Sequence, residues 1–385
     1  MKISGLRKIL VKISIIFLFI FNAPLLLAEN LTPRSIPVGF QEAGEARAKS
    51  SSGAYTKYVS SETSTQQSQN LKGDGYIHPN QPFPKPINDF INHMVNYYHF
   101  DRDQLNSIMS QAEIIPPVIH SIEKPTEIEP WDFYRHIFLT QARISQGAAY
   151  WRLHQKVLKE AERIYGVDPS IIVAIIGVES MYGQEKEHYQ ELGALATLAF
   201  YHQARSTFFE KELEQYFLLA REYHFSPLVL RGSYAGALGI PQFMPDSYRS
   251  FAVSLLHQPQ INLLTNHDDA ILSIANFLSR KGGWIPSQPI ASPVRMNSHI
   301  PPAWLVSASA NPTYPIQLFN KYGITAQNKL SKNQKTALIA MHNTHNDEYW
   351  LVFPNFHAIM SYNPRTTYAL AVYQLSRAIQ EAYEH

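Results

Sequence analysis

The chain contains no cysteine among its 385 residues, so it has no disulfide bonds and no lipid attached through a cysteine. Charge is also sparse, since Asp, Glu, Lys and Arg make up 17% of the residues and the formal net charge is +2. This composition lacks the strongly basic surface of nucleic-acid-binding proteins, so we expect no nucleic-acid partner. Aromatic residues are plentiful, with 22 Tyr and 20 Phe, and a hydrophobic core must take up most of them.

One long apolar run lies near the N-terminus. A segment with four basic residues precedes the run from Ile13 to Leu27, which ends at Ala28. This layout is typical of a secretory signal peptide, and it predicts export to the periplasm with cleavage near Ala28. The run is short for a membrane span, and Asn22 and Pro24 interrupt it, so a retained anchor is the less favoured alternative.

The rest of the chain divides by composition. Residues 1–28 form the expected signal peptide, and residues 29–80, rich in Ser, Thr, Gln, Gly and Glu, predict a flexible linker. Residues 81–385 predict one elongated, mainly α (α+β) unit with subdomains. Apolar spacing predicts helices at 87–98, 102–112, 131–138, 145–165, 169–178, 207–221, 245–256, 268–280 and 367–382. It also predicts strands at 336–341 and 349–353, and the Pro-, Ser- and Asn-rich segment 285–335 should be irregular.

The helix that begins after Asp168 carries a single acidic side chain. Asp168 and Pro169 form an N-cap and first-turn pair, and an apolar run follows until Glu179. Burial at the end of such a helix should keep a carboxyl group protonated to higher pH and suit it to acid catalysis. Taken alone, Glu179 could equally mark the point where a core helix meets water.

A glycine-rich segment at residues 230–248 is the second candidate for a binding site. It carries Ser233 and Gln242, and its glycines allow the backbone to approach a ligand closely. Asp246 is expected to cap the helix that follows Pro245.

At these segments the chain resembles the lytic murein transglycosylase B family of bacterial cell-wall enzymes. The resemblance covers nearly everything after residue 85 and depends on several motifs in order. They are FDRDQL (100–105), PWDFYR (130–135), IIGVES (175–180), LGALATLAF (192–200), RGSYAGALGIPQFMPDSY (231–248), INL (261–263), GGW (282–284) and EYWLVFPNFHAIMSYN (348–363).

The resemblance implies a fold, a substrate and a set of site residues. The fold is a lysozyme-like helical core, here at about residues 165–284, with an additional helical N-terminal part and a small β-containing C-terminal subdomain. The substrate is the glycan strand of peptidoglycan, and Glu179 is implied as the catalytic acid and base. The implied substrate-binding residues are Tyr134, Ser233, Gln242, Phe243, Phe277, Tyr362, Asn363 and Tyr368.

The implied reaction needs one carboxyl group. Glu179 protonates the leaving oxygen and then takes the proton of the muramyl C6 hydroxyl, which closes a 1,6-anhydro ring. The acetamido oxygen of the substrate replaces the second carboxylate of ordinary glycoside hydrolysis, and Gln242 and Asn363 are suited to orient it. Unaided by the resemblance, Tyr368 could simply pack in an amphipathic terminal helix.

The chain departs from the family pattern in three places. Family members can carry a calcium loop before the INL motif, but residues 254–260 contain no carboxylate here, so we expect neither calcium nor any other metal or cofactor. Phe277 stands where Tyr is often found. The basic pair expected after the ALATL motif is reduced to Arg205, with Ala204 before it.

Two rival functions remain from the sequence. A lysozyme-type hydrolase would use water, and an inactive glycan-binding scaffold would keep Glu179 for structure. Residues 342–347, which contain His and Asp, are interpreted as a polar hairpin turn and not as a metal site. We expect a monomer whose partner is the glycan strand; proteins of cell-wall synthesis or division are further conceivable partners that the sequence does not identify.

Overall fold

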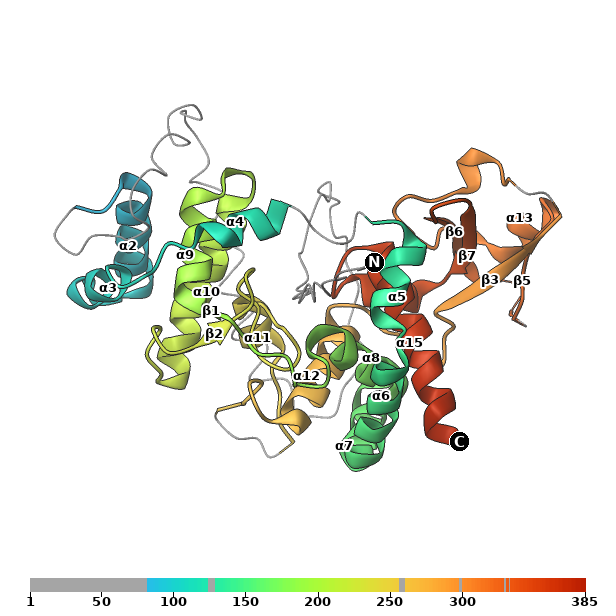
Figure 1. Ribbon diagram of the computed structural model, residues 1–385, viewed down its shortest axis with the longest axis horizontal. Coiled ribbons are helices and arrows are strands. Elements are labelled where there is room, and N and C mark those ends of the chain that lie inside the picture. Colours follow the sequence, from blue (N-terminus) through green and yellow to red (C-terminus); the bar gives the residue numbers. More distant parts are fainter. Residues whose placement is uncertain (1–81, 124–128, 256–259, 298–299, 329, 332) are drawn as a thin grey trace, which may run out of the picture.

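The computed structural model describes residues 82–385 except 124–128, 256–259, 298–299, 329 and 332. The expected signal peptide (1–28) and linker (29–80) lie outside these described residues. Helices gather at one end and in the middle of the molecule, and a small sheet lies at the other end (Figure 1).

The N-terminal helices and three later ones, one of them short, form the end of the molecule opposite the sheet (Figure 1). They are α2 (Lys85–Tyr98), α3 (Arg102–Met109), α4 (Pro116–Glu123), α9 (Glu191–Tyr201), the short η4 (Gln203–Arg205) and α10 (Ser206–Tyr223). Helix α2 is amphipathic and buries Ile87, Phe90, Ile91 and Met94. The expected α3 starts because the Asp101 side chain accepts a hydrogen bond from Gln104 N at 2.8 Å.

The middle of the molecule surrounds one fully buried helix. The central helices are α6 (Gln141–Leu153), α7 (Gln155–Tyr165), α8 (Pro169–Ser180), α11 (Pro245–Phe251) and α12 (His267–Arg280). Every residue of α8 is buried, because α6, α7, α12 and the C-terminal helix all pack against it. A two-stranded ladder of β1 (Tyr189–Gln190) and β2 (Arg231–Gly232) joins the segment after α8 to the glycine-rich segment.

A five-stranded antiparallel sheet of order β4-β6-β7-β3-β5 forms the other end of the molecule (Figure 1). Its elements are β3 (Ala291–Met296), η5 (Ala303–Leu305), β4 (Tyr314–Pro315), α13 (Ile316–Lys321), β5 (Ile324–Ala326), β6 (Lys335–His342) and β7 (Asp347–Val352). A small separate core includes Leu338 of β6, which pairs with Leu351 of β7. Strands β6 and β7 were expected, and residues 343–346 form the predicted hairpin turn between them, with Asn343 N donating to Asn346 O at 3.0 Å.

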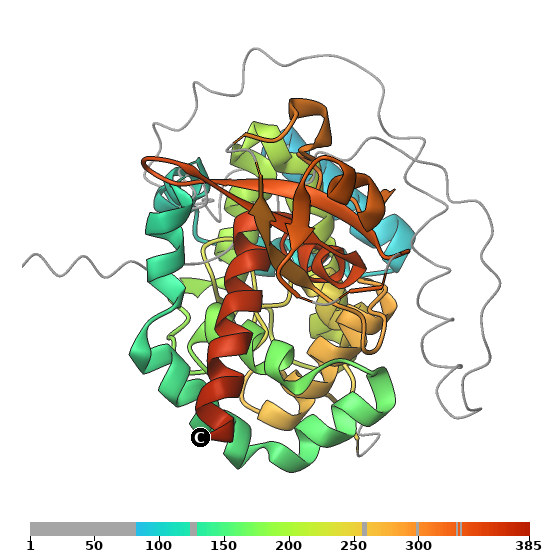
Figure 2. The same ribbon diagram turned by 90° about the vertical axis from the view of Figure 1, so that its right-hand side faces the viewer.

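The chain returns from the sheet to the middle through α14 (Pro354–Met360) and α15 (Thr366–Glu384). Helix α15 runs down from the sheet to the C-terminus (Figure 2) and packs on α5 (Trp131–Phe138), α6 and α8. Helix α15 therefore brings its side chains next to α8, although the two helices lie far apart in the sequence.

Three expected elements differ from the structure. The predicted helix at 145–165 is two helices, because His154 leaves the helical conformation with φ −102° and ψ 20°. The predicted helix at 245–256 ends at Phe251. Segment 285–335, expected to be irregular, contains strands of the sheet, including β3 with Pro293 inside it. Strand β3 nevertheless pairs with both β5 and β7. The hydrogen bonds to these two strands therefore outweigh the local preference of Pro293 for irregular structure.

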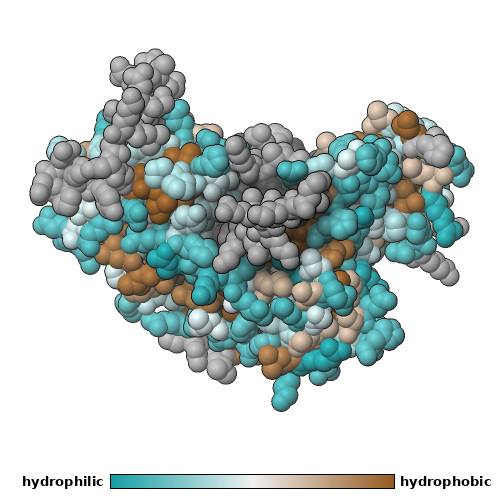
Figure 3. Space-filling model, viewed as in Figure 1, coloured by the Kyte–Doolittle hydropathy of each residue, from teal (hydrophilic) through white to brown (hydrophobic). Residues whose placement is uncertain are grey.

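On the face shown in Figure 3, the hydrophobic residues among the described ones lie in several separate groups. Among the described residues, no helix is long and apolar enough to cross a membrane.

Candidate active site

Glu179 lies in the last turn of α8, and its residue is 4% exposed. The helix starts at Asp168, whose side chain accepts a hydrogen bond from Ser170 N at 2.8 Å. It ends at Met181, which adopts a left-handed conformation with φ +48°. The predicted cap and apolar run thus place the carboxyl group of Glu179 at a fixed point in a buried setting.

Two tyrosines from the C-terminal segment lie near this point, and one of them bonds the carboxyl group. Tyr368 of α15 donates a hydrogen bond from its hydroxyl to Glu179 Oε1 at 2.7 Å. Its ring lies almost parallel to that of Tyr362, with centroids 6.4 Å apart and an interplanar angle of 9°. Burial, followed by the charge of Glu179, raises the pKa of both Tyr362 and Tyr368 well above the ordinary phenol value. Both hydroxyls therefore stay protonated and can donate hydrogen bonds at neutral pH.

Ser233 is held by the backbone of its own segment. Its Oγ accepts hydrogen bonds from Ala237 N at 2.9 Å and Ala235 N at 3.2 Å. Two accepted bonds leave the hydroxyl proton of Ser233 available for a further acceptor.

Gln242 follows a tight turn that starts at Gly239. Both residues have positive φ, +70° for Gly239 and +50° for Gln242. A Cβ at Gly239 would lie 2.3 Å from Leu263 O, so only glycine fits there. The Gln242 side chain donates from Nε2 to Gly239 O at 2.8 Å, which fixes the direction of its amide.

Glu179, Ser233 and Gln242, predicted from separate segments, line the same open pocket, whose volume out to its mouth is about 570 Å³. The other lining residues are Ser180, Gly183, Glu185, Lys186, Glu187, Gly239, Ile240 and Leu264. The pocket therefore combines a buried carboxyl group with neutral hydrogen-bonding groups and a charged wall at residues 185–187.

Phe243 and Phe277 lie in an aromatic cluster behind the pocket. Their ring centroids are 5.5 Å apart, and each ring contacts Tyr362, at 5.8 Å and 5.0 Å. Both phenylalanines are at most 2% exposed and do not line the pocket. The structure thus gives them contacts that hold Tyr362, and Tyr362 in turn donates to Pro241 O.

Tyr134 and Asn363 are also buried and lie outside the pocket lining. The Tyr134 ring packs against Phe138, with centroids 5.1 Å apart, and its proximity contributes to the raised pKa of Tyr368. The amide nitrogen and oxygen of Asn363 have no hydrogen-bond partner among the described residues. A buried amide without partners is costly unless a ligand or water satisfies it.

The sequence interpretation missed three side chains beside the pocket. Ser180 donates to Ile240 O at 2.7 Å, and its position next to Glu179 was the only signal for it. Glu187 accepts from Gly239 N at 2.6 Å. Glu191 is fully buried under the glycine-rich segment, where a Cβ at Gly232 would lie 2.0 Å from its Oε2.

No cluster of His, Asp and Glu that could hold a metal ion is present in the described part of the chain. The segment at 254–260, where no calcium site was expected, lies partly outside the described residues.

Comparison with known proteins matches residues 82–377 to the family model described as the transglycosylase SLT domain. The chain is 37% identical over 300 residues to membrane-bound lytic murein transglycosylase B of Escherichia coli (strain K12), covering 75% of this chain and 81% of that protein.

Solved structures show the same fold. The soluble lytic transglycosylase SltB1 from Pseudomonas aeruginosa matches with a TM-score of 0.72 and 36% identity, over 78% of this chain and 100% of that chain. SltB3 from the same organism, solved in complex with NAG-anhNAM-pentapeptide, matches with a TM-score of 0.63 and 25% identity, over 76% of this chain and 78% of that chain. These matches confirm the predicted mainly helical, lysozyme-like fold with its small sheet. The chain belongs to the transglycosylase SLT domain family and is a lytic murein transglycosylase of the B type, an enzyme that acts on peptidoglycan.

Proposed function

We propose that Glu179 is the single acid and base of a reaction that cleaves the β-1,4 bond between N-acetylmuramic acid and N-acetylglucosamine. Glu179 donates its proton to the glycosidic oxygen as the bond breaks. The resulting carboxylate takes the proton of the C6 hydroxyl while that oxygen bonds to the anomeric carbon. The product ends in 1,6-anhydro-N-acetylmuramic acid, and the protonated carboxyl group is ready for another cycle.

The observation that supports this proposal most is the environment of Glu179. The carboxyl group borders the pocket at the end of a buried helix, and the Tyr368 hydroxyl donates to it at 2.7 Å. Tyr368 stabilises the carboxylate once the proton has left, and burial favours the protonated form before that step. Both protonation states of the cycle are thereby accessible to one group.

Neutral groups around the pocket suit the acetamido group of the substrate. Asn363 has an unsatisfied donor and acceptor among the described residues, which are the groups that an N-acetyl group complements. Ser233 retains a hydroxyl proton that can bond the Glu179 carboxylate or a sugar oxygen. Phe243 and Phe277 support this role by packing against Tyr362. Tyr134 lies near Tyr368, and Gln242 lines the pocket that would hold the substrate.

The substrate is proposed from the relatives as well as from the pocket. SltB3 was solved with a disaccharide that bears an anhydro-muramyl end and a pentapeptide, which is the product type of the reaction proposed here. We propose that residues 81–385 form the catalytic unit with its core at about 165–284. Export by residues 1–28 would place the enzyme in the periplasm.

Hydrolysis by water is the second candidate, because Glu185 and Glu187 also line the pocket. Glu187 already accepts the Gly239 amide, which leaves Glu185 as the carboxylate free to activate water. The two reactions give different products from the same bond.

The role of Glu179 is tested by the Glu179→Gln variant. We expect release of soluble fragments from purified peptidoglycan to fall by about 10²–10⁴-fold, the usual contribution of a positioned acid or base. The Glu185→Gln variant is the matched comparison, and it should keep a rate within about threefold of wild type under the proposed mechanism. Equal losses in both variants would favour the two-carboxylate hydrolase, and full activity of Glu179→Gln would overturn both mechanisms.

A further inference from the structure

The turn from Gly239 to Gln242 is held to the rest of the pocket by contacts on several sides. Ile240 N donates to Leu263 O at 2.9 Å, and Ile240 O accepts from Ser180 Oγ at 2.7 Å. Pro241 O accepts from the Tyr362 hydroxyl. Leu238 O accepts from Phe243 N at 3.1 Å, so the peptide unit that precedes Gly239 is held at its oxygen, and its N–H needs an anchor of its own.

Glu187 supplies that anchor. Its Oε1 accepts a hydrogen bond from Gly239 N at 2.6 Å, and Gly239 N has no other partner among the described residues. The carbonyl oxygen of Gly239 then accepts from both Gln242 N at 3.0 Å and Gln242 Nε2 at 2.8 Å. The backbone of Gly239 therefore connects the Glu187 carboxyl group to the side chain of Gln242 through two hydrogen bonds.

The surroundings of Glu187 suit this role. Glu187 is half-buried in the pocket wall and comes two residues before β1, which pairs with β2 of the glycine-rich segment. Hydrogen bonds from backbone N–H groups to a carboxylate are shorter and stronger than neutral ones. Burial raises the pKa of Glu187, and the bond from Gly239 opposes part of that rise.

Gly239 cannot hold its conformation through a side chain of its own. Its φ is +70°, and no Cβ can be accommodated beside Leu263. The peptide unit between Leu238 and Gly239 has two hydrogen bonds, one from Phe243 N to Leu238 O and one from Gly239 N to Glu187. Without Glu187 this unit keeps only the first bond and leaves a donor unpaired, which loosens the turn whose Gly239 O accepts from Gln242 Nε2.

We propose that Glu187 is a positioning residue that acts through Gly239 to fix the amide of Gln242 against the substrate. This inference rests on the proposed role of Gln242 in the pocket. It assigns Glu187 no proton transfer, because the carboxyl oxygen nearest the turn is already occupied by the Gly239 amide.

A double-mutant cycle tests the proposal in the full chain. The variants are Glu187→Ala, Gln242→Ala and the double variant, assayed by initial rates of soluble muropeptide release over a range of peptidoglycan concentrations. We expect Glu187→Ala to lower kcat by about ten- to a hundredfold with little change in KM, since a small misplacement of a site group has that effect. The double variant should be no slower than Gln242→Ala, because residues that act through one another are not additive.

The conservative variant separates positioning from charge. In Glu187→Gln the amide oxygen can still accept the Gly239 bond, so we expect it to recover activity to within about threefold of wild type. Glu381→Ala, an exposed carboxylate change on α15, is the control for loss of charge elsewhere. Thermal melting of each variant shows whether the fold is kept.

Three results would overturn the proposal: wild-type kcat in a folded Glu187→Ala, additive losses in the cycle, or Glu187→Gln as slow as Glu187→Ala. The proposed reaction can fail separately, because the cycle measures bond cleavage whatever the product ends are. Hydrolytic ends with a non-additive cycle would reject the anhydro mechanism and keep the role of Glu187.

Discussion

At the scale of single residues, the hydrogen bond from Tyr368 to Glu179 makes the most direct prediction. Tyr368→Phe removes the hydroxyl donor at 2.7 Å and keeps the ring that stacks on Tyr362. An O–H donor favours the ionised form of the carboxyl group that accepts it. We therefore expect the alkaline limb of the pH–activity profile to move to higher pH in this variant, with a lower maximal rate.

Tyr362→Phe is the matched comparison, because the hydroxyl of Tyr362 donates to Pro241 O and not to Glu179. Its pH profile should keep the position of the wild-type limb. A Tyr368→Phe profile that coincides with wild type would show that the bond has no part in the titration of the site.

Glu191 gives a prediction about stability and pH. Burial, followed by the charges of Glu187 and Glu212, raises its pKa well above the ordinary value. The unfolded chain releases this proton near pH 4.3, whereas the folded protein keeps it, so stability is fully present below that pH and is lost as pH rises toward the folded-state pKa. The Glu191→Gln variant has no titratable group at this position, so it lacks this pH-dependent loss of stability.

We expect the Tm of Glu191→Gln to exceed that of wild type at pH 8 by more than about 2 °C, with a much smaller difference at pH 5. Glu381→Gln, at an exposed position, should show no such dependence. Calorimetry at the two pH values measures both. A Tm difference that does not change with pH would contradict a neutral buried Glu191.

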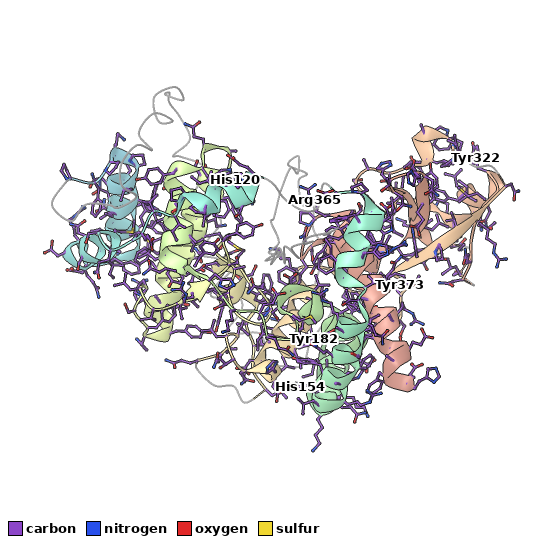
Figure 4. All side chains as sticks on the ribbon, viewed as in Figure 1. His120, His154, Tyr182, Tyr322, Arg365 and Tyr373 are labelled. Carbon is purple, nitrogen blue, oxygen red and sulfur yellow. The ribbon has the colours of Figure 1, made fainter. Side chains whose placement is uncertain are left out.

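At the scale of elements, two glycines allow α6 and α8 to approach closely. The Tyr182 hydroxyl lies in a notch between Gly147 and Gly177, where an added Cβ on either helix would lie 2.5 Å from that oxygen. The hydroxyl donates to Arg143 O at 2.7 Å, and Arg143 Nε donates to Gly177 O at 2.9 Å. Figure 4 shows Tyr182 among these central helices, with His154 below it.

Gly177→Ala tests this packing. Helix propensity alone would stabilise the variant by up to about 1 kcal/mol, whereas overpacking typically costs about 1–3 kcal/mol. The ring of Tyr182 cannot retreat easily, since its Cζ is 2.7 Å from the added Cβ position. We expect a net loss of Tm of several degrees and reduced activity, because Tyr182 follows Glu179 by three residues. A higher Tm would show that the notch can expand.

The same elements show what the sequence could predict. The Asp168–Pro169 start and the apolar run predicted α8 and the position of Glu179, because cap and burial signals are local. Helix α5 was predicted with its observed bounds, Trp131–Phe138. Helix α9 was missed, since its almost continuous apolar sequence has no helical period.

The missed features depend on contacts between distant segments. The break at His154 has no proline or glycine to signal it. The His154 ring packs against His267, with the two centroids 5.1 Å apart. The role of Glu187 depends on a hydrogen bond to a glycine 52 residues later. Neither contact has a counterpart in local sequence pattern.

At the scale of the whole molecule, the pocket and its surroundings are assembled from three segments that lie far apart in the sequence. Helix α8 contributes Glu179, the glycine-rich segment contributes Ser233 and Gln242, and α15 returns from the sheet with Tyr368 (Figure 2). The sequence predicted these residues through separate motifs, and the fold brings them close together. The pocket also contains the carboxylates of residues 185 and 187, which the motifs did not indicate.

We propose that Glu179 alone completes the reaction by intramolecular attack of the C6 hydroxyl. The most direct test of this proposal is mass spectrometry of the muropeptides that the full chain releases from purified peptidoglycan. The mechanism predicts ends one water lighter than hydrolytic products, because the substrate's own hydroxyl replaces water. Reducing muramyl ends formed at the same bond would contradict it and assign the pocket carboxylates to hydrolysis.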